Sequence, residues 1–283
     1  MISLLPLLLG PVWADDALDV LILDDGGEET ADLVSLLEGQ GHDVTCSCDD
    51  GALESDFDGA IYALEDHDVV FWLDGGMSRS GDDMPTAGQE ALVAWIEGGG
   101  GLIHYAATVA RFLDDGENQA AEDLMLLDGS DLTIGTAEFE VIDGTSAASG
   151  ALATGDTFQI LGLAMVASDA GLGSTIVEWA PGDEPEGPYE ALVLDDLDDG
   201  RIAQLGWVGH MGTSWSSNLD YTNPTVIRLL PGVVQAVARR PPEVDAGGPY
   251  AADPGDLVLV SGTATDHDGG DVTCGWDLDE DGF

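Results

Sequence analysis

Short apolar runs alternate with amphipathic helical segments through most of the first 240 residues, and this alternation limits the chain to a small set of folds. Leu18–Leu23 is a nearly continuous apolar run, as expected of a parallel strand that is covered on both faces. Three similar strands are expected at 42–46, 69–73 and 102–105. Because each crossover between them is short, the pattern predicts an α/β fold in which helices cover both faces of a parallel sheet.

Local signals also place three helices. Thr30 should open the first helix, which the glycines after residue 38 stop. Thr86 and Gln89 have the spacing of a capping box at the start of the second. Asn223-Pro224 supplies an N-cap and a first helical residue for the third, and Pro231-Gly232 is expected to break that helix.

The segment between the fourth strand and the third helix is less regular. It predicts short, partly antiparallel strands at 132–134, 139–142, 159–163 and 175–179. A closing hairpin is expected from 191–194 and 202–208, around an acidic turn at 195–200.

The charge balance excludes some partners. The chain has 56 acidic residues against 6 basic ones, for a formal charge of -50, so nucleic acid and anionic membrane surfaces are not expected to bind. Such a surface suits a halophilic, high-salt setting, where self-repulsion is screened, although an acidic secreted protein of ordinary habitat is an alternative. A hydrophobic content of 44% is enough for a real core.

The N-terminus indicates export. The apolar run Ile2–Trp13 is too short to span a bilayer, and it is followed by a favourable cleavage position after Ala14. Residues 1–14 therefore resemble a secretory signal peptide without the usual basic start, and the expected location is secreted, periplasmic or at the cell surface. An apolar N-terminal strand is the alternative.

The three cysteines do not form a disulfide framework. Cys46 and Cys48 are one residue apart on an expected strand, so their side chains should point to the same face. They could be half of a metal site, but no further ligands are evident, and two buried thiols are the favoured interpretation. Cys274 is expected to be a core residue.

Two segments resemble ThuA-like proteins: Glu97–Thr108, which is a glycine-rich turn and strand, and Gly200–His210, which is a strand with a Gly-His end. The resemblance implies the flavodoxin-like fold of class I glutamine amidotransferases for residues 15–238. The chain departs from the family at Tyr105-Ala106, where a His is usual. His104 lies one place earlier and is expected on the other face of the sheet.

In an open parallel sheet, ligands bind outside the carboxyl ends of the strands. Four segments should converge there, and they supply carboxylates, glycines, an aromatic ring and a histidine. The expected ligand is a carbohydrate or another polar molecule, bound by Asp24, Asp74, Gly75, Tyr105, His210 and Trp215. A divalent cation held by Asp24, Asp25, Asp74 and His210 is one alternative. Turn-forming Asp-Gly pairs with a structural His210 are another.

Catalysis is less strongly indicated. Amidotransferase chemistry would need a nucleophilic Cys after the fourth strand, where this chain has Tyr105-Ala106, and no cofactor is evident in the α/β domain. A hydrolase for sugars or esters, with His210 as catalytic residue beside an Asp or a metal, is an alternative function. Ser78 is a weaker candidate nucleophile. An inert structural module of the surface is a third hypothesis.

The C-terminal segment carries a different signature. Asp277, Asp279 and Asp281 alternate ahead of Gly282, as in an oxygen-ligand loop for calcium. Together with the ordered run from Pro242, this segment resembles the first half of a PKD domain, an immunoglobulin-like β-sandwich. The resemblance implies a partial PKD-like sandwich at 244–283 and a chain that is a fragment of a longer extracellular protein. The Arg- and Pro-rich residues before it predict a linker at 239–243. Ca²⁺ is the cation that the Asp spacing would suit.

Overall fold

A computed structural model describes residues 17–24, 30–50, 56–73, 84–105, 119–126, 131–166, 173–179, 189–206, 221–238, 243–245, 247 and 261–265. The chain divides into two compact units, Met1–Ala238 and Arg239–Phe283, and each is described by itself. Within the described helices, none is long and apolar enough to cross a membrane.

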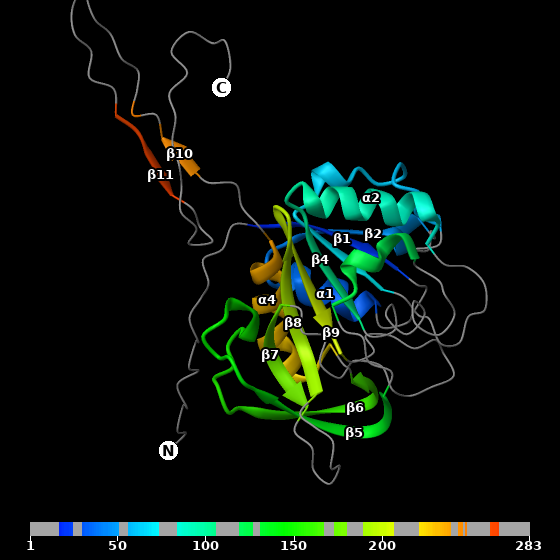
Figure 1. Cartoon of the computed structure of the whole chain (residues 1–283), viewed down its shortest axis with the longest axis vertical. Helices are drawn as coiled ribbons and strands as arrows, with labels where there is room; N and C mark the ends of the chain where they lie inside the picture. The colour runs from blue at the N-terminus through cyan, green and yellow to red at the C-terminus, as the bar shows by residue number, and fades with distance from the viewer. Residues whose placement is uncertain are drawn as a thin grey trace, which may run out of the picture. The chain divides into compact units, whose positions relative to one another are not determined.

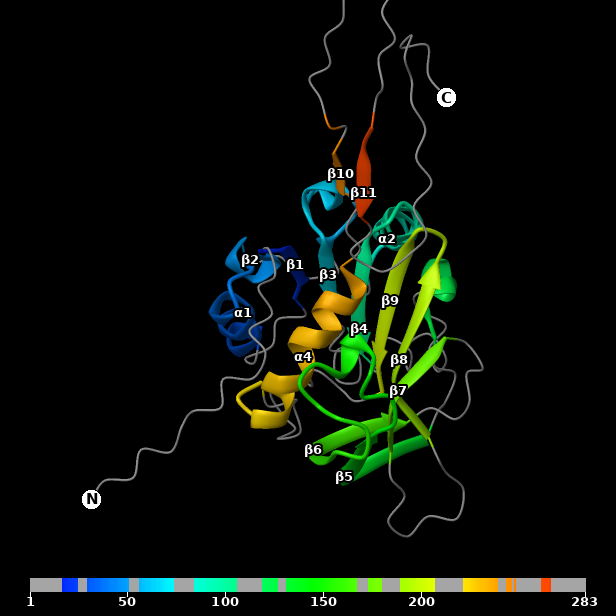
Figure 2. The ribbon, with the colours of Figure 1, turned by 90° about the vertical axis from the view of Figure 1, so that its left-hand side faces the viewer.

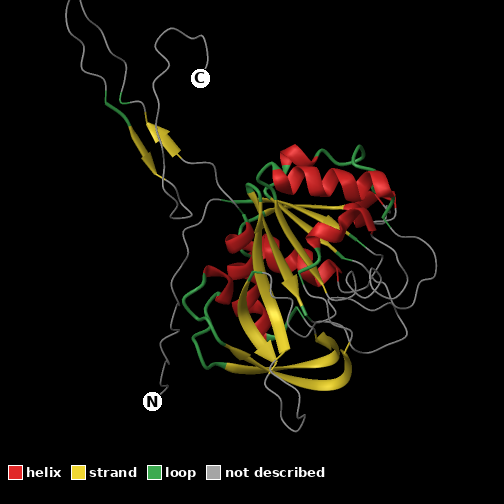
Figure 3. Ribbon diagram, in the orientation of Figure 1, coloured by secondary structure: helices red, strands yellow, loops and turns green. Residues whose placement is uncertain are grey.

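Unit 1 is built on one large mixed sheet (Figures 1 and 3). Its described strands are β1 (Asp19–Leu23), β2 (Asp43–Cys46), β3 (Val69–Trp72), β4 (Gly101–Tyr105), β5 (Asp131–Val141), β6 (Thr157–Val166), β7 (Ser174–Trp179), β8 (Tyr189–Leu197) and β9 (Gly200–Leu205). They are ordered β2-β1-β3-β4-β9-β8-β7-β5-β6. In this spatial order the first five strands, from β2 to β9, are parallel to one another. The remaining four, from β8 to β6, continue the sheet with antiparallel pairings. The predicted α/β fold with a parallel sheet is thus confirmed, and antiparallel strands extend it.

Helices cover both faces of the parallel strands. The α-helices are α1 (Thr30–Gly39), α2 (Thr86–Glu97) and α4 (Pro224–Val237), and the 3-10 helices are η1 (Ser47–Asp50), η3 (Leu64–Asp66), η4 (Gln119–Leu124) and η5 (Ala147–Ser149). Figure 2 shows α1 and α4 on one side of the sheet and α2 on the other. This follows from right-handed crossovers that leave β1 and β3 in opposite directions along the sheet.

The two faces carry separate cores. On the α1 and α4 face, alternate residues of the central strands pack with the apolar sides of these two helices. On the opposite face, the intervening residues pack against α2 and η4. Each central strand is therefore apolar on both sides, which is the reason for the continuous apolar runs in the sequence.

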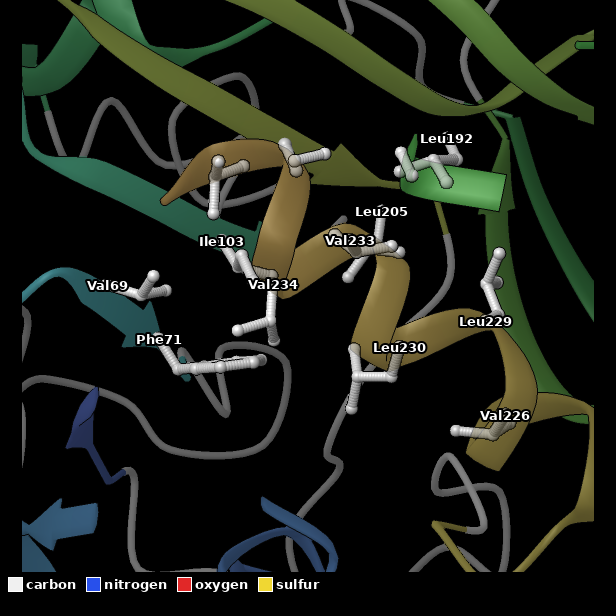
Figure 4. Close-up of a cluster of buried hydrophobic side chains, with 14 of the residues drawn as sticks. Val69, Phe71, Ile103, Leu192, Leu205, Val226, Leu229, Leu230, Val233 and Val234 are labelled. Atoms are coloured by element: carbon white, nitrogen blue, oxygen red, sulfur yellow. The ribbon is translucent and has the colours of Figure 1, made fainter. Parts of the chain in front are cut away.

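The closing helix α4 is continuous, so the expected break at Pro231-Gly232 is wrong. Asn223 caps the helix as expected, since its side chain accepts a hydrogen bond from the Thr225 N–H at 2.8 Å. Pro231 removes only one helical N–H donor, and burial of the apolar side of α4 outweighs that loss. Figure 4 shows this side, where Val233 and Val234 lie near Ile103 of β4.

Gly232 of α4 instead makes room for a neighbouring loop. The Arg228 carbonyl accepts a hydrogen bond from the Ala151 N–H at 3.0 Å, just after η5. A side chain at Gly232 would collide with the backbone of Ala147 and Gly150. A glycine that normally helps to end helices therefore serves here for close backbone packing.

The strands expected at 132–134 and 139–142 are one strand, β5, which pairs with β6 from Asp131 to Glu140. Gly135 lies in the middle of this pairing, opposite Gly162. Two glycines weaken the local signal for a strand, whereas the long antiparallel pairing carries the strand through them.

The described part of unit 2 contains a two-stranded antiparallel sheet, formed by β10 (Glu243–Asp245) and β11 (Thr263–Thr265). The expected calcium ligands Asp277, Asp279 and Asp281 lie outside the described residues. The PKD-like sandwich and its Ca²⁺ stay predictions.

Candidate functional site

Four neighbouring parallel strands end at one edge of the sheet, which we call the carboxyl edge. β1 ends at Leu23, β3 at Trp72, β4 at Tyr105 and β9 at Leu205. The strand order reverses between β1 and β3, because β2 lies on one side of β1 and all later strands lie on the other. Such a switch point at the carboxyl ends is where open α/β sheets bind ligands.

Asp24 lies directly at this switch point and is buried. Its backbone N–H donates to the Ser47 Oγ at 2.9 Å, and its Oδ1 accepts from the Thr30 hydroxyl at 2.5 Å. Since Thr30 is the first residue of α1, the Asp24 carboxylate is fixed beside the start of that helix. This position is favourable for a negative charge. Asp24 therefore has a structural role at the edge where the sequence predicted a ligand contact.

Tyr105, the last residue of β4, is buried on the α1 and α4 face. Its hydroxyl lies 3.1 Å from the Tyr221 hydroxyl. Burial raises the pKa of the Tyr105 phenol, and the hydrogen bond to Tyr221 opposes that shift only in part. The phenol is therefore neutral at any ordinary pH, and it can act on a ligand only as a hydrogen-bonding group.

The other predicted ligand residues, Asp74, Gly75, His210 and Trp215, lie outside the described residues, as does Asp25. Asp74 and Gly75 follow β3 in the sequence, and His210 and Trp215 follow β9. In the described part of the chain, no three His, Cys, Asp or Glu side chains are grouped to hold a metal ion.

The expectation that His104 lies on the opposite face from Tyr105 is confirmed. His104 is fully buried, and its Nε2 lies 2.9 Å from the carbonyl oxygen of Leu124, which belongs to the α2-side core. Burial lowers the pKa of His104 to about 4, against smaller opposing contributions from backbone hydrogen bonds. The imidazole is therefore neutral at pH 7, with Nε2–H as the donor to Leu124.

Three buried polar side chains anchor the segment 119–126. The capping box predicted for one of them, Gln89, is wrong, because the N-cap of α2 is Pro85 and no side chain caps the helix. The sequence predicted no such anchoring role for any of the three. Gln89 Oε1 accepts from the Ala120 N–H at 3.0 Å, and Gln204 Oε1 accepts from the Leu126 N–H at 2.5 Å. His104 supplies the third contact, and it pairs in register with Gln204 across β4 and β9. A signal was present, because a His and a Gln interrupt otherwise apolar strands. These contacts hold the segment 119–126 in the α2-side core.

His104 gives the folded protein a defined pH dependence. The unfolded imidazole takes up a proton below a pKa of about 6.5, whereas the folded one does so only near 4. Between these values the unfolded state binds more protons, so stability falls as the pH falls, by about 3 kcal/mol in total. Urea unfolding of wild type and His104→Gln at pH 7, 6, 5 and 4 should show this extra loss in wild type only. Equal pH slopes would contradict it.

A polar hollow lies away from the carboxyl edge, next to the β8–β9 turn at the amino end of β9. Its volume is about 300 Å³, and it is lined by Asp143, Ser146, Ser174, Ile176, Leu194, Asp195, Asp196 and Arg201. Arg201 is held there by Asp196, at 2.7 Å, and by the Ala236 carbonyl, at 2.9 Å. The sequence analysis did not predict this hollow, because it depends on how the antiparallel strands dock.

Cys46 and Cys48 form a disulfide, so the favoured interpretation of two free thiols is wrong. The chain does not continue as a strand beyond Cys46 but turns at once into η1, and the two Cα atoms are 5.1 Å apart. That turn brings the sulfurs into bonding geometry. Ser47, between the two cysteines, is the residue that accepts the hydrogen bond from Asp24.

Solved structures share this architecture. A ThuA-like protein from Parabacteroides merdae ATCC 43184 matches with a TM-score of 0.55 at 14% identity, over 89% of this chain and 98% of that one. A ThuA-like protein from Bacteroides uniformis ATCC 8492 matches with a TM-score of 0.54 at 13% identity, over 81% and 96%. A β-galactosidase from Rahnella sp. R3 matches with a TM-score of 0.52 at 14% identity, over 78% of this chain and 31% of that one.

These likenesses define the class of the protein at the level of fold: the chain has a ThuA-like fold. No protein-family model matches the sequence, and neither does any curated protein. The likeness to solved structures therefore identifies the fold class, and the activity depends on the chemistry of the site.

Proposed function

We propose that this chain is a secreted or surface-associated member of the ThuA-like family that binds a carbohydrate or a similar polar ligand, without glutaminase activity. The supporting observation is the carboxyl edge, where four adjacent parallel strands end around a switch point. In the sequence, Asp74 and Gly75 follow β3, and His210 and Trp215 follow β9. Carboxylates and an imidazole suit sugar hydroxyls, and an indole ring suits the apolar face of a sugar.

Two further observations favour this proposal over a glutaminase. β4 ends at Tyr105 and Ala106 follows it in the sequence, so neither position offers the nucleophilic thiol that an amidotransferase needs there. The disulfide also removes Cys46 and Cys48 as free nucleophiles. In addition, the same fold occurs as part of a β-galactosidase, a protein named for a sugar substrate.

The C-terminal segment fits an extracellular setting. We propose that residues 244–283 begin a PKD-type module and that Asp277, Asp279 and Asp281 supply oxygen ligands to Ca²⁺. The cleavable leader at residues 1–14 belongs to the same proposal, since PKD-type modules occur in exported proteins.

Ligand binding can be tested with a pair of matched substitutions. A glycan array identifies a ligand for the wild-type chain, and calorimetry then compares Asp74→Asn with Asp198→Asn. Losing a hydrogen bond to a charged group costs about 1.5–3 kcal/mol, so Asp74→Asn should weaken binding by roughly 10- to 100-fold. Asp198 lies in the β8–β9 turn with φ 50°, a conformation that Asn tolerates, so the control should bind as wild type.

Other outcomes would count against the proposal. If no glycan binds, the ligand is not a carbohydrate of the kinds tested. If both variants bind as wild type, Asp74 takes no part in binding and the site is not at the carboxyl edge. His210→Ala separates binding from hydrolysis. A glycosidase or esterase rate in the wild type that this substitution abolishes would favour the hydrolase instead.

A further inference from the structure

The Cys46–Cys48 disulfide is poorly placed to act as a structural staple. A disulfide stabilises a fold mainly by closing a loop of the unfolded chain, and the effect grows with the length of that loop. This one encloses a single residue, Ser47. It also joins β2, an edge strand of the sheet, only to the short helix that follows directly. Its contribution to stability is therefore small, and a chemical role is the better explanation for the pair.

The two sulfurs have unequal surroundings. Cys46 ends β2 inside the α1-side core and is 3% exposed, whereas Cys48 is only partly buried. The Cys48 N–H donates to the Cys46 Sγ at 3.2 Å. A thiolate formed on Cys46 would accept a hydrogen bond from a backbone donor that is already in place, and this offsets part of the cost of a charge in the apolar core. Of the two residues, Cys48 is the more exposed to solvent.

We propose that Cys46–Cys48 is a thiol–disulfide exchange site in which Cys48 is attacked and Cys46 is the leaving group. An incoming thiolate forms a bond to the Cys48 Sγ, the Cys46–Cys48 bond breaks, and its electron pair leaves on the Cys46 Sγ. A second thiolate then attacks the incoming sulfur and releases Cys48. The two external thiols are oxidised to one disulfide, and Cys46 and Cys48 become the reduced dithiol.

The charge of the protein selects the class of thiol. Asp49, next to Cys48, is exposed, and the chain as a whole has a formal charge of -50. Anionic thiols are repelled from this surface, while thiols that carry an ammonium group are attracted. The expected substrates are therefore small cationic thiols and their disulfides. Salt should reduce this preference, because it screens the interaction.

The redox state of the Cys46–Cys48 pair should also affect the position of Asp24 at the carboxyl edge. Ser47 lies between the two cysteines, and its hydroxyl accepts the Asp24 N–H at 2.9 Å. Reduction frees Ser47 to move and loosens Asp24 at the switch point. This coupling rests on the proposed ligand site, whereas the exchange chemistry does not, so the following experiment measures exchange without any ligand.

The test uses the full chain in a Cys274→Ser background, so that only the proposed pair can react. The folded protein is treated with cysteamine or with glutathione, then alkylated with N-ethylmaleimide and weighed by mass spectrometry. We expect no label before reduction and two labels after it. Cysteamine should react at least 10-fold faster than glutathione at low salt, and the two rates should converge in molar NaCl. Circular dichroism should show that the protein stays folded.

Single substitutions test the roles of the two sulfurs. In Cys46→Ser the remaining Cys48 should label at least 10-fold faster than the remaining Cys46 does in Cys48→Ser. Two labels without reductant, reduction only in denaturant, equal labelling of the two single variants, or a faster rate with glutathione would each overturn the proposal.

Discussion

Replacing Gly200 with alanine should destabilise unit 1 by about 3 kcal/mol, the upper end of the usual cost of overpacking. Gly200 opens β9 and is packed against the end of α2, where a Cβ would collide with the carbonyl oxygens of Ile96 and Gly100. These atoms are backbone and cannot rotate away. The neighbouring Arg201 N–H donates to the same Gly100 carbonyl at 3.2 Å, so the collision also disturbs the junction of β9 with the parallel core. Urea unfolding measures the loss.

Gly39→Ala is the matched control for this substitution. Gly39 is the last residue of α1, and a Cβ there would have no heavy atom within 4 Å. Alanine has the higher helix propensity, so the control should be neutral or slightly stabilising. A Gly200→Ala variant as stable as Gly39→Ala would mean that β9 does not pack on the end of α2 as described.

The folded protein should gain stability as NaCl rises from low to molar concentration. With a formal charge of -50, the acidic side chains of the folded protein repel one another, and this repulsion destabilises the compact state. Salt weakens the repulsion, because the screening length falls from about 10 Å at 0.1 M salt to about 3 Å at 1 M. We expect the melting temperature to rise by on the order of 10 °C, which corresponds to about 3 kcal/mol. A melting temperature that is flat or falls across this range would refute the expectation.

A row of three neighbouring carboxylates allows charge repulsion to be tested with a single substitution. Glu140, Glu178 and Glu190 lie in register on the adjacent strands β5, β7 and β8. Partial burial raises the pKa of Glu178, and the charges of Glu190 and Glu140 raise it further. Glu178→Gln should therefore be more stable than wild type at low salt and should gain less from added NaCl. An unchanged salt response would show that repulsion in this row is negligible.

The parallel half of the fold could be predicted from the sequence because its signals are local. β3 was expected at 69–73 and spans Val69–Trp72, and α1 begins at the predicted Thr30. These elements are buried on both faces or along one stripe, so their apolar patterns follow directly from burial. The carboxyl edge could be predicted for the same reason, since parallel order brings the ends of β1, β3, β4 and β9 together.

Long-range packing decided the features that the sequence analysis missed. The continuity of β5 depends on its pairing with β6, and the continuity of α4 depends on burial and on the docking of η5 at Gly232. The disulfide could not be predicted without knowing that the chain turns immediately after Cys46. The anchoring roles of Gln89 and Gln204 depend on segment 119–126, whose backbone N–H groups donate to both side chains. None of these partners is close in sequence to the residue whose role it sets, except Cys48.

The central claim is that a polar ligand binds at the carboxyl edge, and hydrogen–deuterium exchange with and without a glycan from the array tests it most directly. Binding should slow amide exchange in the segments that follow β1, β3, β4 and β9, including Asp24 and the residues around Asp74 and His210. The β8–β9 turn at Asp198 and Asp199 should be unaffected, because it lies at the opposite end of β9. Protection confined to that turn or to the nearby hollow around Arg201, with none at the carboxyl edge, would contradict the claim.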